Sequence, residues 1–181
     1  MTRFGYVMTT YFSVVAIGGL SLVPITPRLI WNASASTPVG LYALDPADRV
    51  EVTDLVALHA PKPLAGFLAT RGYLPPGVLL LKRVLGLPGQ SVCRNGRAIT
   101  VDGIEMGEAL ARDHDGRDLP VWRGCRRIGE EEVFLMNWQV SDSFDGRYFG
   151  PILRASIIGR ATPVFTDEAG DGSYQWFAPT R

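Results

Sequence analysis

An uncharged run of 24 residues between Arg3 and Arg28 is the strongest constraint on how this chain folds. A helix needs about 20 apolar residues to cross a bilayer. We therefore predict a membrane-spanning helix over residues 4–25, within an anchor over residues 1–28. A cleaved signal peptide is the alternative, because Ala33-Ser34-Ala35 resembles a cleavage site, but the apolar core of such a peptide spans only about 7–15 residues. One arginine at each end leaves the orientation of the helix open.

The remainder of the chain has the composition of a β protein. Hydrophobic residues make up 46% of the sequence, which is enough for a packed core, and 13 prolines and 20 glycines predict many turns and short strands. We expect one mainly antiparallel β domain over residues 29–165 and a C-terminal tail over 166–181. The expected strands are 39–44, 55–59, 78–85, 90–94, 97–101, 131–138 and 155–165, with a short helix over 64–70.

Charge and cysteine content exclude some classes of function. The formal net charge is zero, so no nucleic-acid partner is indicated. Cys93 and Cys125 lack metal-ligand spacing and are too few for a disulfide scaffold. They could form one bridge in an oxidising compartment. Nothing in the sequence predicts a metal or another cofactor.

Two residues could together carry hydrolytic chemistry. Ser36 comes shortly after the uncharged run, and Lys82 lies in the apolar segment Val78–Leu85. A serine hydroxyl needs a base to become a nucleophile, and a lysine can be that base when burial keeps it neutral. In a strand, Lys82 shares a face with Leu80 and Val84, while Arg83 points the other way, where it can reach water. The alternative is an edge-strand lysine whose ammonium reaches solvent.

Other candidate groups are fewer. His59 and His114 lie in no recognisable triad context, and the Gly-x-Ser-x-Gly elbow is absent. The segment 141–151 offers Ser143, Asp145 and Arg147, which could orient a neutral lysine through hydrogen bonds. A calcium loop is the alternative for this segment, but Ile152 stands where an EF-hand needs glutamate. An ordinary solvated turn is the other.

Three segments in this order resemble type I signal peptidases of the Ser–Lys class (the S26 family), and most of all its conjugative-transfer branch of TraF-like pilin maturation peptidases. They are Asn32–Tyr42 (Asn-Ala-Ser-Ala-Ser-Thr-Pro-Val-Gly-Leu-Tyr), Leu81–Gly89 (Leu-Lys-Arg-Val-Leu-Gly-Leu-Pro-Gly) and Ser143–Pro151 (Ser-Phe-Asp-Gly-Arg-Tyr-Phe-Gly-Pro). The resemblance covers about residues 4–165. Leader peptidases carry Gly-Asp-Asn-Arg where this chain has Asn137-Trp-Gln-Val140, which favours the conjugative branch. Gly146 replaces a serine that is common in the family, a departure interpreted here as minor.

The resemblance implies a role for each matching residue. Ser36 matches the nucleophile and Lys82 the general base. Ser34 matches a residue whose hydroxyl helps to form the oxyanion hole, together with the backbone N–H of Ser36. Ser143 matches the serine that hydrogen-bonds the lysine. Asp145 matches an aspartate that the conjugative branch is thought to need for activity.

The resemblance also implies a setting. The expected enzyme is a single-pass protein of the bacterial inner membrane, with its catalytic domain in the periplasm, where a Cys93–Cys125 bridge could form. Its partners are the lipid bilayer and a membrane-inserted precursor, most of all a conjugative pilin subunit, which it would cleave and could cyclise. The alternative is a non-enzymatic, membrane-anchored β scaffold of an envelope or secretion complex. A self-cleaving Ser–Lys repressor is disfavoured, because the N-terminal run leaves no room for a DNA-binding domain.

Overall fold

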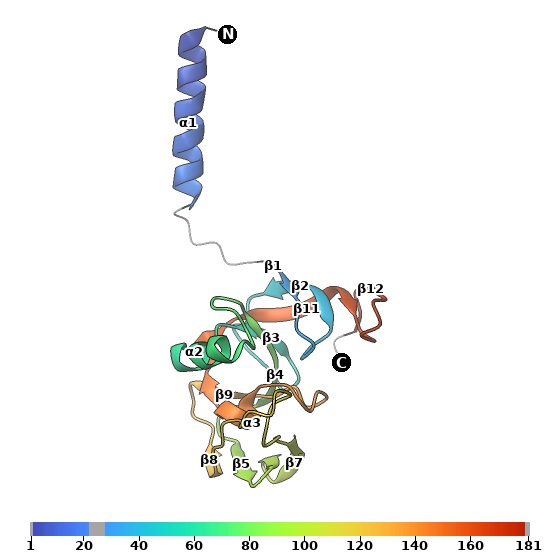
Figure 1. Ribbon diagram of the computed structural model, residues 1–181. Coiled ribbons are helices and arrows are strands. Elements are labelled where there is room, and N and C mark those ends of the chain that lie inside the picture. Colours follow the sequence, from blue (N-terminus) through green and yellow to red (C-terminus); the bar gives the residue numbers. More distant parts are fainter. Residues whose placement is uncertain (1, 22–27, 180–181) are drawn as a thin grey trace.

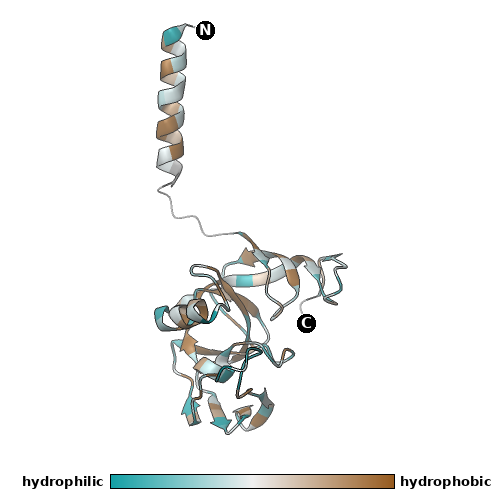
Figure 2. Cartoon of the chain, viewed as in Figure 1, coloured by the Kyte–Doolittle hydropathy of each residue, from teal (hydrophilic) through white to brown (hydrophobic). Residues whose placement is uncertain are grey.

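The computed structural model describes residues 2–21 and 28–179, which form one long helix and a β domain (Figure 1). The long helix, α1 (Arg3–Ser21), leaves most of its apolar side chains exposed. Figure 2 shows hydrophobic residues at intervals along it. The predicted membrane helix also includes residues 22–25, which lie outside the described residues. Within the part of the chain that the structure describes, no helix is both long enough and apolar enough to cross a membrane.

The larger of two sheets holds the candidate chemistry. Within the described residues it has the order β1–β2–β11–β3–β4–β9–β10, with β12 paired to β11, and the pairings are antiparallel. Its strands are β1 (Leu29–Asn32), β2 (Val39–Asp45), β3 (Leu55–Leu58), β4 (Leu80–Gly86), β9 (Glu132–Leu135), β10 (Ile152–Leu153), β11 (Ile157–Asp167) and β12 (Gln175–Trp176).

A smaller antiparallel sheet, in the order β7–β6–β5–β8, packs at the far end of the domain from α1 (Figure 1). Its strands are β5 (Ser91–Asn95), β6 (Ala98–Val101), β7 (Ile104–Glu108) and β8 (Gly124–Arg127). Cys93 and Cys125 lie directly opposite each other on β5 and β8 and form a disulfide. Three short helices complete the fold: α2 (Lys62–Arg71), α3 (Gly146–Phe149) and the 3-10 turn η1 (Arg154–Ser156).

The predicted antiparallel β class is confirmed, and each of the seven predicted strands has a counterpart within a few residues. Five strands were not predicted: β1, β7, β8, β10 and β12. They are short, and β8 is exposed along its whole length, so it shows no alternation of apolar and polar residues. The predicted C-terminal tail includes β12, whose Trp176 pairs with Phe165 on β11.

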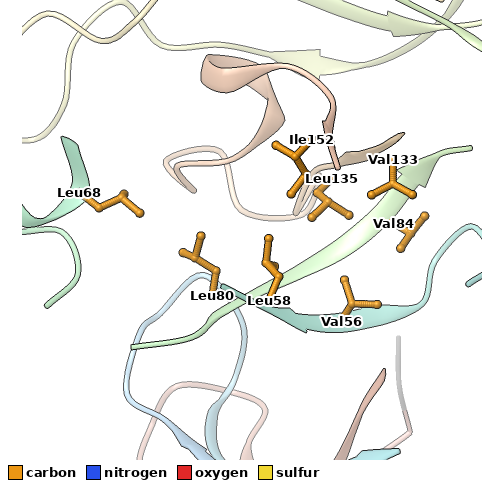
Figure 3. Packing of buried hydrophobic residues seen from close by; sticks show 8 residues of the cluster. All are labelled: Val56, Leu58, Leu68, Leu80, Val84, Val133, Leu135 and Ile152. Atoms are coloured by element: carbon orange, nitrogen blue, oxygen red, sulfur yellow. The ribbon is translucent and has the colours of Figure 1, made fainter. Parts of the chain in front are cut away.

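Strand β4 runs through the centre of the domain, between β3 and β9. All seven of its residues are buried, because both faces of the strand are covered. Leu80 and Val84 belong to the core cluster of Figure 3, and Leu85 belongs to a second cluster beneath the small sheet. A strand covered on both faces usually reads as a continuous apolar run, but β4 also carries Lys82 and Arg83, which are both buried. The eight buried residues of the first cluster are Val56, Leu58, Leu68, Leu80, Val84, Val133, Leu135 and Ile152.

Gly40 fixes how β2 begins. Its φ is +150°, and a Cβ there would lie 2.2 Å from the carbonyl oxygen of Phe165 on β11. Only glycine permits so close an approach of two backbones. The segment Ser34–Pro38 is therefore held between β1 and a tightly paired β2.

Candidate active site

The turn between β1 and β2 is organised by the side chain of Asn32. Its Nδ2 donates to the carbonyl oxygens of Ser34 (2.8 Å), Thr37 (3.0 Å) and Pro38 (3.0 Å), and to the Thr37 hydroxyl at 2.9 Å. Its Oδ1 accepts from the backbone N–H of Ser34 at 3.1 Å. Asparagine favours such turns because its short amide reaches nearby backbone groups. Asn32 is buried, so the turn that carries Ser34 and Ser36 is tied to β1.

The two serine hydroxyls are joined to each other. Ser34 Oγ lies 2.9 Å from Asn32 Oδ1 and 3.2 Å from Ser36 Oγ. An amide oxygen only accepts, so the single hydroxyl proton of Ser34 goes to Asn32. Ser36 therefore donates to Ser34 in this arrangement. Ser34 must release Asn32 before it can donate to an oxyanion.

Lys82 lies on β4 with only 2% of its surface exposed. Its Nζ donates to the Ser143 hydroxyl at 2.8 Å. Burial lowers the pKa of Lys82 from its ordinary 10.5 to about 8; the carboxylate of Asp145 opposes this shift and the Arg147 guanidinium adds to it. In mildly alkaline solution, Lys82 is thus neutral in a large fraction of the molecules, and the neutral amine can accept a proton.

The loop over residues 137–147 is built around Arg147. The Arg147 guanidinium pairs with Asp145 at 2.8 Å in the interior, where both side chains are almost wholly inaccessible. It also donates to the carbonyl oxygens of Val140 (2.6 Å), Ser141 (3.0 Å) and Ser143 (3.3 Å). A buried charge needs several such partners to offset its desolvation. The ion pair therefore shapes the loop that brings Ser143 to Lys82.

A cavity of about 360 Å³ brings the candidate groups together. Ser34, Ser36, Lys82 and Ser143 all line it. The rest of its wall is mainly apolar, and the side chains of Asp113, His114 and Asp142 also line it. A mostly apolar pocket with a few convergent polar groups is typical of a binding or catalytic site.

Four of the five predicted site residues thus line one cavity. Among the described residues, Lys82 is hydrogen-bonded to Ser143 and Ser36 to Ser34, with no direct hydrogen bond between Lys82 and Ser36. Asp145 is fully buried outside the cavity wall. Its carboxylate accepts from Arg147 and from the backbone N–H of Asn137 at 3.0 Å. Its contacts are those of a group that shapes the loop.

Two expectations for β4 are wrong. The edge-strand alternative for Lys82 fails because β3 and β9 flank β4 on both sides. Arg83 was expected to reach water, yet it is buried. The face it occupies is covered, and its guanidinium donates to the Thr53 carbonyl oxygen at 3.0 Å and lies 5.8 Å from the centre of the Trp138 ring.

The replacement of the family's serine by Gly146 is more than a minor departure. A Cβ at this position would lie 2.5 Å from the carbonyl oxygen of Leu135 and 2.6 Å from the Phe134 ring. The loop therefore packs against β9 more closely than a side chain permits.

The sequence reasoning did not predict that Asn32 and Asn137 contact the backbone of the candidate site. The Asn-x-Ser spacing before Ser34 is a usable signal for Asn32, because asparagine caps turns two residues on. Asn137 had a weaker signal, a polar residue at the end of the apolar segment Val133–Met136. Its contacts reach segments far away in the sequence, so no local pattern reveals them.

The chain is similar in sequence to a known family and to several known proteins. The sequence model of the family "Signal peptidase, peptidase S26" matches residues 3–166. The plasmid transfer protein TraF of Escherichia coli is 34% identical over 147 residues, which cover 75% of this chain and 81% of that protein. The probable conjugal transfer protein TraF of Sinorhizobium fredii is 38% identical over 143 residues, covering 75% and 76%.

A more distant relative is the probable signal peptidase I-1 of Synechocystis, 30% identical over 111 residues that cover 61% of this chain and 52% of that protein. The family match spans the turn of Ser36, strand β4 and the loop around Arg147. The chain therefore belongs to the S26 signal peptidase family, within its TraF-like branch.

Proposed function

We propose that this chain is a serine endopeptidase in which Ser36 is the nucleophile and Lys82 the general base. The observation that carries the proposal is the position of Lys82, buried in the wall of the cavity that Ser36 also lines, with a pKa of about 8. Lysine serves as a general base only where its amine is kept neutral and is oriented towards the hydroxyl that it deprotonates. The burial and the Ser143 hydroxyl supply these two conditions.

The proposed reaction begins when neutral Lys82 takes the Ser36 proton as Ser36 Oγ attacks the scissile carbonyl carbon. A neutral amine has one lone pair and two N–H groups, so Nζ can accept from Ser36 while it still donates to Ser143. The Ser36 hydroxyl first turns from Ser34 towards Lys82. The backbone N–H of Ser36 and the hydroxyl of Ser34 then donate to the oxyanion.

The tetrahedral intermediate collapses to an acyl-enzyme on Ser36. The C–N bond breaks, and protonated Lys82 gives its proton to the leaving amine. Water, deprotonated by Lys82, releases the new carboxyl terminus. If an amino group of the substrate attacks instead, the product is a peptide bond, and a chain that supplies its own amino terminus becomes cyclic.

The proposed substrate is a membrane-inserted precursor, and the names of the TraF relatives favour one that serves plasmid transfer, such as a pilin subunit. We propose that the uncharged run ending at Arg28 anchors the enzyme in the inner membrane, with its domain in the periplasm. The exposed apolar side chains of α1 support an anchor, and the Cys93–Cys125 disulfide supports an oxidising compartment. Sharing one surface raises the effective concentration of the cleavage site.

The direct test is precursor processing by Ser36→Ala and Lys82→Ala variants in cells that carry the transfer system. Each should abolish processing while the protein keeps wild-type levels and near-UV circular dichroism. Ser173→Ala and Lys62→Ala are matched controls, because both residues are exposed and Lys62 is the only other lysine. Normal processing by either Ser36→Ala or Lys82→Ala would show that the proposed dyad is wrong.

The mass of the processed substrate shows whether water or an amino group has attacked the acyl-enzyme. A cyclic product is lighter by one water molecule than the linear product cut at the same bond. Intact-mass measurement of the mature subunit separates the two outcomes.

A further inference from the structure

The side chain of Asn137 joins the two halves of the candidate dyad. Asn137 follows β9 and is 3% exposed. Its Nδ2 donates to the carbonyl oxygen of Ser36 at 2.6 Å and to that of Leu81 at 3.3 Å. Its Oδ1 accepts from the backbone N–H of Arg83 at 2.9 Å. Both N–H donors and the oxygen acceptor of the carboxamide are thus hydrogen-bonded. Their partners are the two residues that flank Lys82 in the sequence and Ser36 itself.

The side chain of Asn137 takes the place of a neighbouring strand beside β4, where β9 has ended. The pairing of β4 with β9 ends at Val84 and Leu135, and the backbone hydrogen bond from the Met136 N–H to the Arg83 carbonyl oxygen is the last before Asn137. Beyond it, the Asn137 carboxamide presents an acceptor and a donor to β4 as a peptide group would. On the other side of β4, Lys82 pairs with Val56 of β3. The backbone around Lys82 is therefore held from both sides.

The contact with Ser36 spans 101 residues of sequence. It fixes the carbonyl group of Ser36, and hence the torsion that sets where the Ser36 Cα–Cβ bond points. The backbone of Asn137 is held in turn, because its N–H donates to Asp145 and its carbonyl oxygen accepts from Arg147 at 3.3 Å. The buried ion pair, strand β4 and the turn of Ser36 thus meet at this residue.

We propose that Asn137 is a positioning residue that sets the placement of Ser36 relative to Lys82, an inference that rests on the proposed Ser–Lys peptidase function. Asn137 does not line the cavity, so it acts through the backbones of its neighbours. Only a carboxamide offers two donors and one acceptor at one point. Aspartate would face two carbonyl oxygens with acceptors alone. Alanine would leave two buried backbone groups of β4 and the part-buried Ser36 carbonyl oxygen without this partner.

The test uses the full-length chain in detergent micelles and a quenched fluorogenic peptide with alanine one and three residues before the scissile bond. The variants are Asn137→Ala, Asn137→Gln and, as a matched destabilised control, Val101→Ala, which removes buried volume beneath the small sheet. Each is measured well below its own unfolding temperature. We expect Asn137→Ala to lower kcat at least tenfold with KM within about twofold of wild type, since chemistry and not binding depends on the alignment.

Asn137→Gln keeps the carboxamide and should recover part of the lost kcat, whereas Val101→Ala should stay within about twofold of wild type. A kcat for Asn137→Ala within twofold of that for Val101→Ala overturns the positioning role. If Asn137→Ala does not fold, the comparison rests on Asn137→Gln, whose kcat must then fall below that of Val101→Ala. Cleavage that persists in Lys82→Ala would instead contradict the proposed Ser36–Lys82 dyad. Failure of the dyad and failure of the positioning role of Asn137 are therefore distinguishable.

Discussion

The ammonium group of Lys82 lies in surroundings that disfavour its charge. Apolar neighbours on β4 and the core cluster around it exclude water, and Asp145 only partly offsets the loss of hydration. A general base works best when its pKa lies near the operating pH. Burial of this one side chain therefore both costs stability and supplies the proposed chemistry.

The rate of processing should follow the titration of Lys82. We expect kcat/KM to rise as the pH rises through about 8 and to level off above it, because only the neutral amine accepts a proton from Ser36. Initial rates with the fluorogenic peptide between pH 6 and 9.5 measure this profile. A rate that is flat across that range would contradict a lysine base.

Stability should depend on the same group. The folded protein releases the Lys82 proton near pH 8 and the unfolded chain near 10.5, so between these values the unfolded state binds more protons and the free energy of unfolding rises with pH. Below pH 8 both states are protonated and the full penalty of the buried charge is present. Lys82→Met removes that penalty, so it should be more stable at pH 7, by roughly 3 kcal/mol at most.

Urea unfolding of both proteins from pH 7 to 10 gives the measurement. The variant's advantage should shrink as pH rises, and taking the difference removes the contribution of tyrosines common to both. An advantage that stays constant from pH 7 to 10 would mean that Lys82 keeps its ordinary pKa in the folded state, which would contradict the depressed value.

At the scale of elements, the loop over residues 137–147 and strand β9 depend on each other. Arg147 gathers the loop's carbonyl oxygens, and the loop approaches β9 where Gly146 leaves no side chain. Arg94, from β5 of the small sheet, adds a hydrogen bond of 2.5 Å to the Arg147 carbonyl oxygen. The small sheet thus supports the loop that carries Ser143.

Gly146→Ala should disturb this packing. Its new Cβ meets the Leu135 carbonyl oxygen and the Phe134 ring, so we expect a loss of about 1–3 kcal/mol in the free energy of unfolding. It should also lower kcat, since Ser143 and Asn137 belong to the same loop. Gly66→Ala is the matched control: a Cβ there meets nothing within 4 Å in the interior of α2, and about 0.5–1 kcal/mol of stabilisation is expected. Equal stability of the two variants would contradict the close packing at Gly146.

How far the sequence predicts these elements depends on the range of the interactions. The apolar neighbours of Lys82 predicted a strand and made its burial one of two interpretations, and the flanking strands β3 and β9 decide between them. The burial of Arg83 was not predictable, since the covering of its face depends on Trp138 and Thr53 from other segments. Asn137 was not predictable either, because its side chain contacts the backbone of β4 and a turn 101 residues away.

At the scale of the whole molecule, exposed apolar side chains occur together at β1 and β12, which lie at the end of the domain nearer α1 in Figure 1. Leu29 and Trp31 on β1 and Trp176 and Phe177 at β12 are exposed. Trp31 stacks on Tyr174, and Trp176 packs against Phe165. Tryptophan and tyrosine favour the interface between lipid and water, so this arrangement suits a domain held against a bilayer.

The last prediction concerns attachment to the membrane. We expect the full chain to sediment with inner membranes and to resist extraction at alkaline pH, because the proposed anchor, the uncharged run before Arg28, would lie within the lipid. A variant that lacks residues 2–27 should be released by alkaline carbonate, since surface aromatic residues alone hold a domain weakly. A Trp31→Ala and Trp176→Ala double variant of the full chain should remain membrane-bound. If alkaline carbonate releases the full chain, the run does not span the bilayer, and the peptidase would have to meet its precursor by diffusion or through a partner.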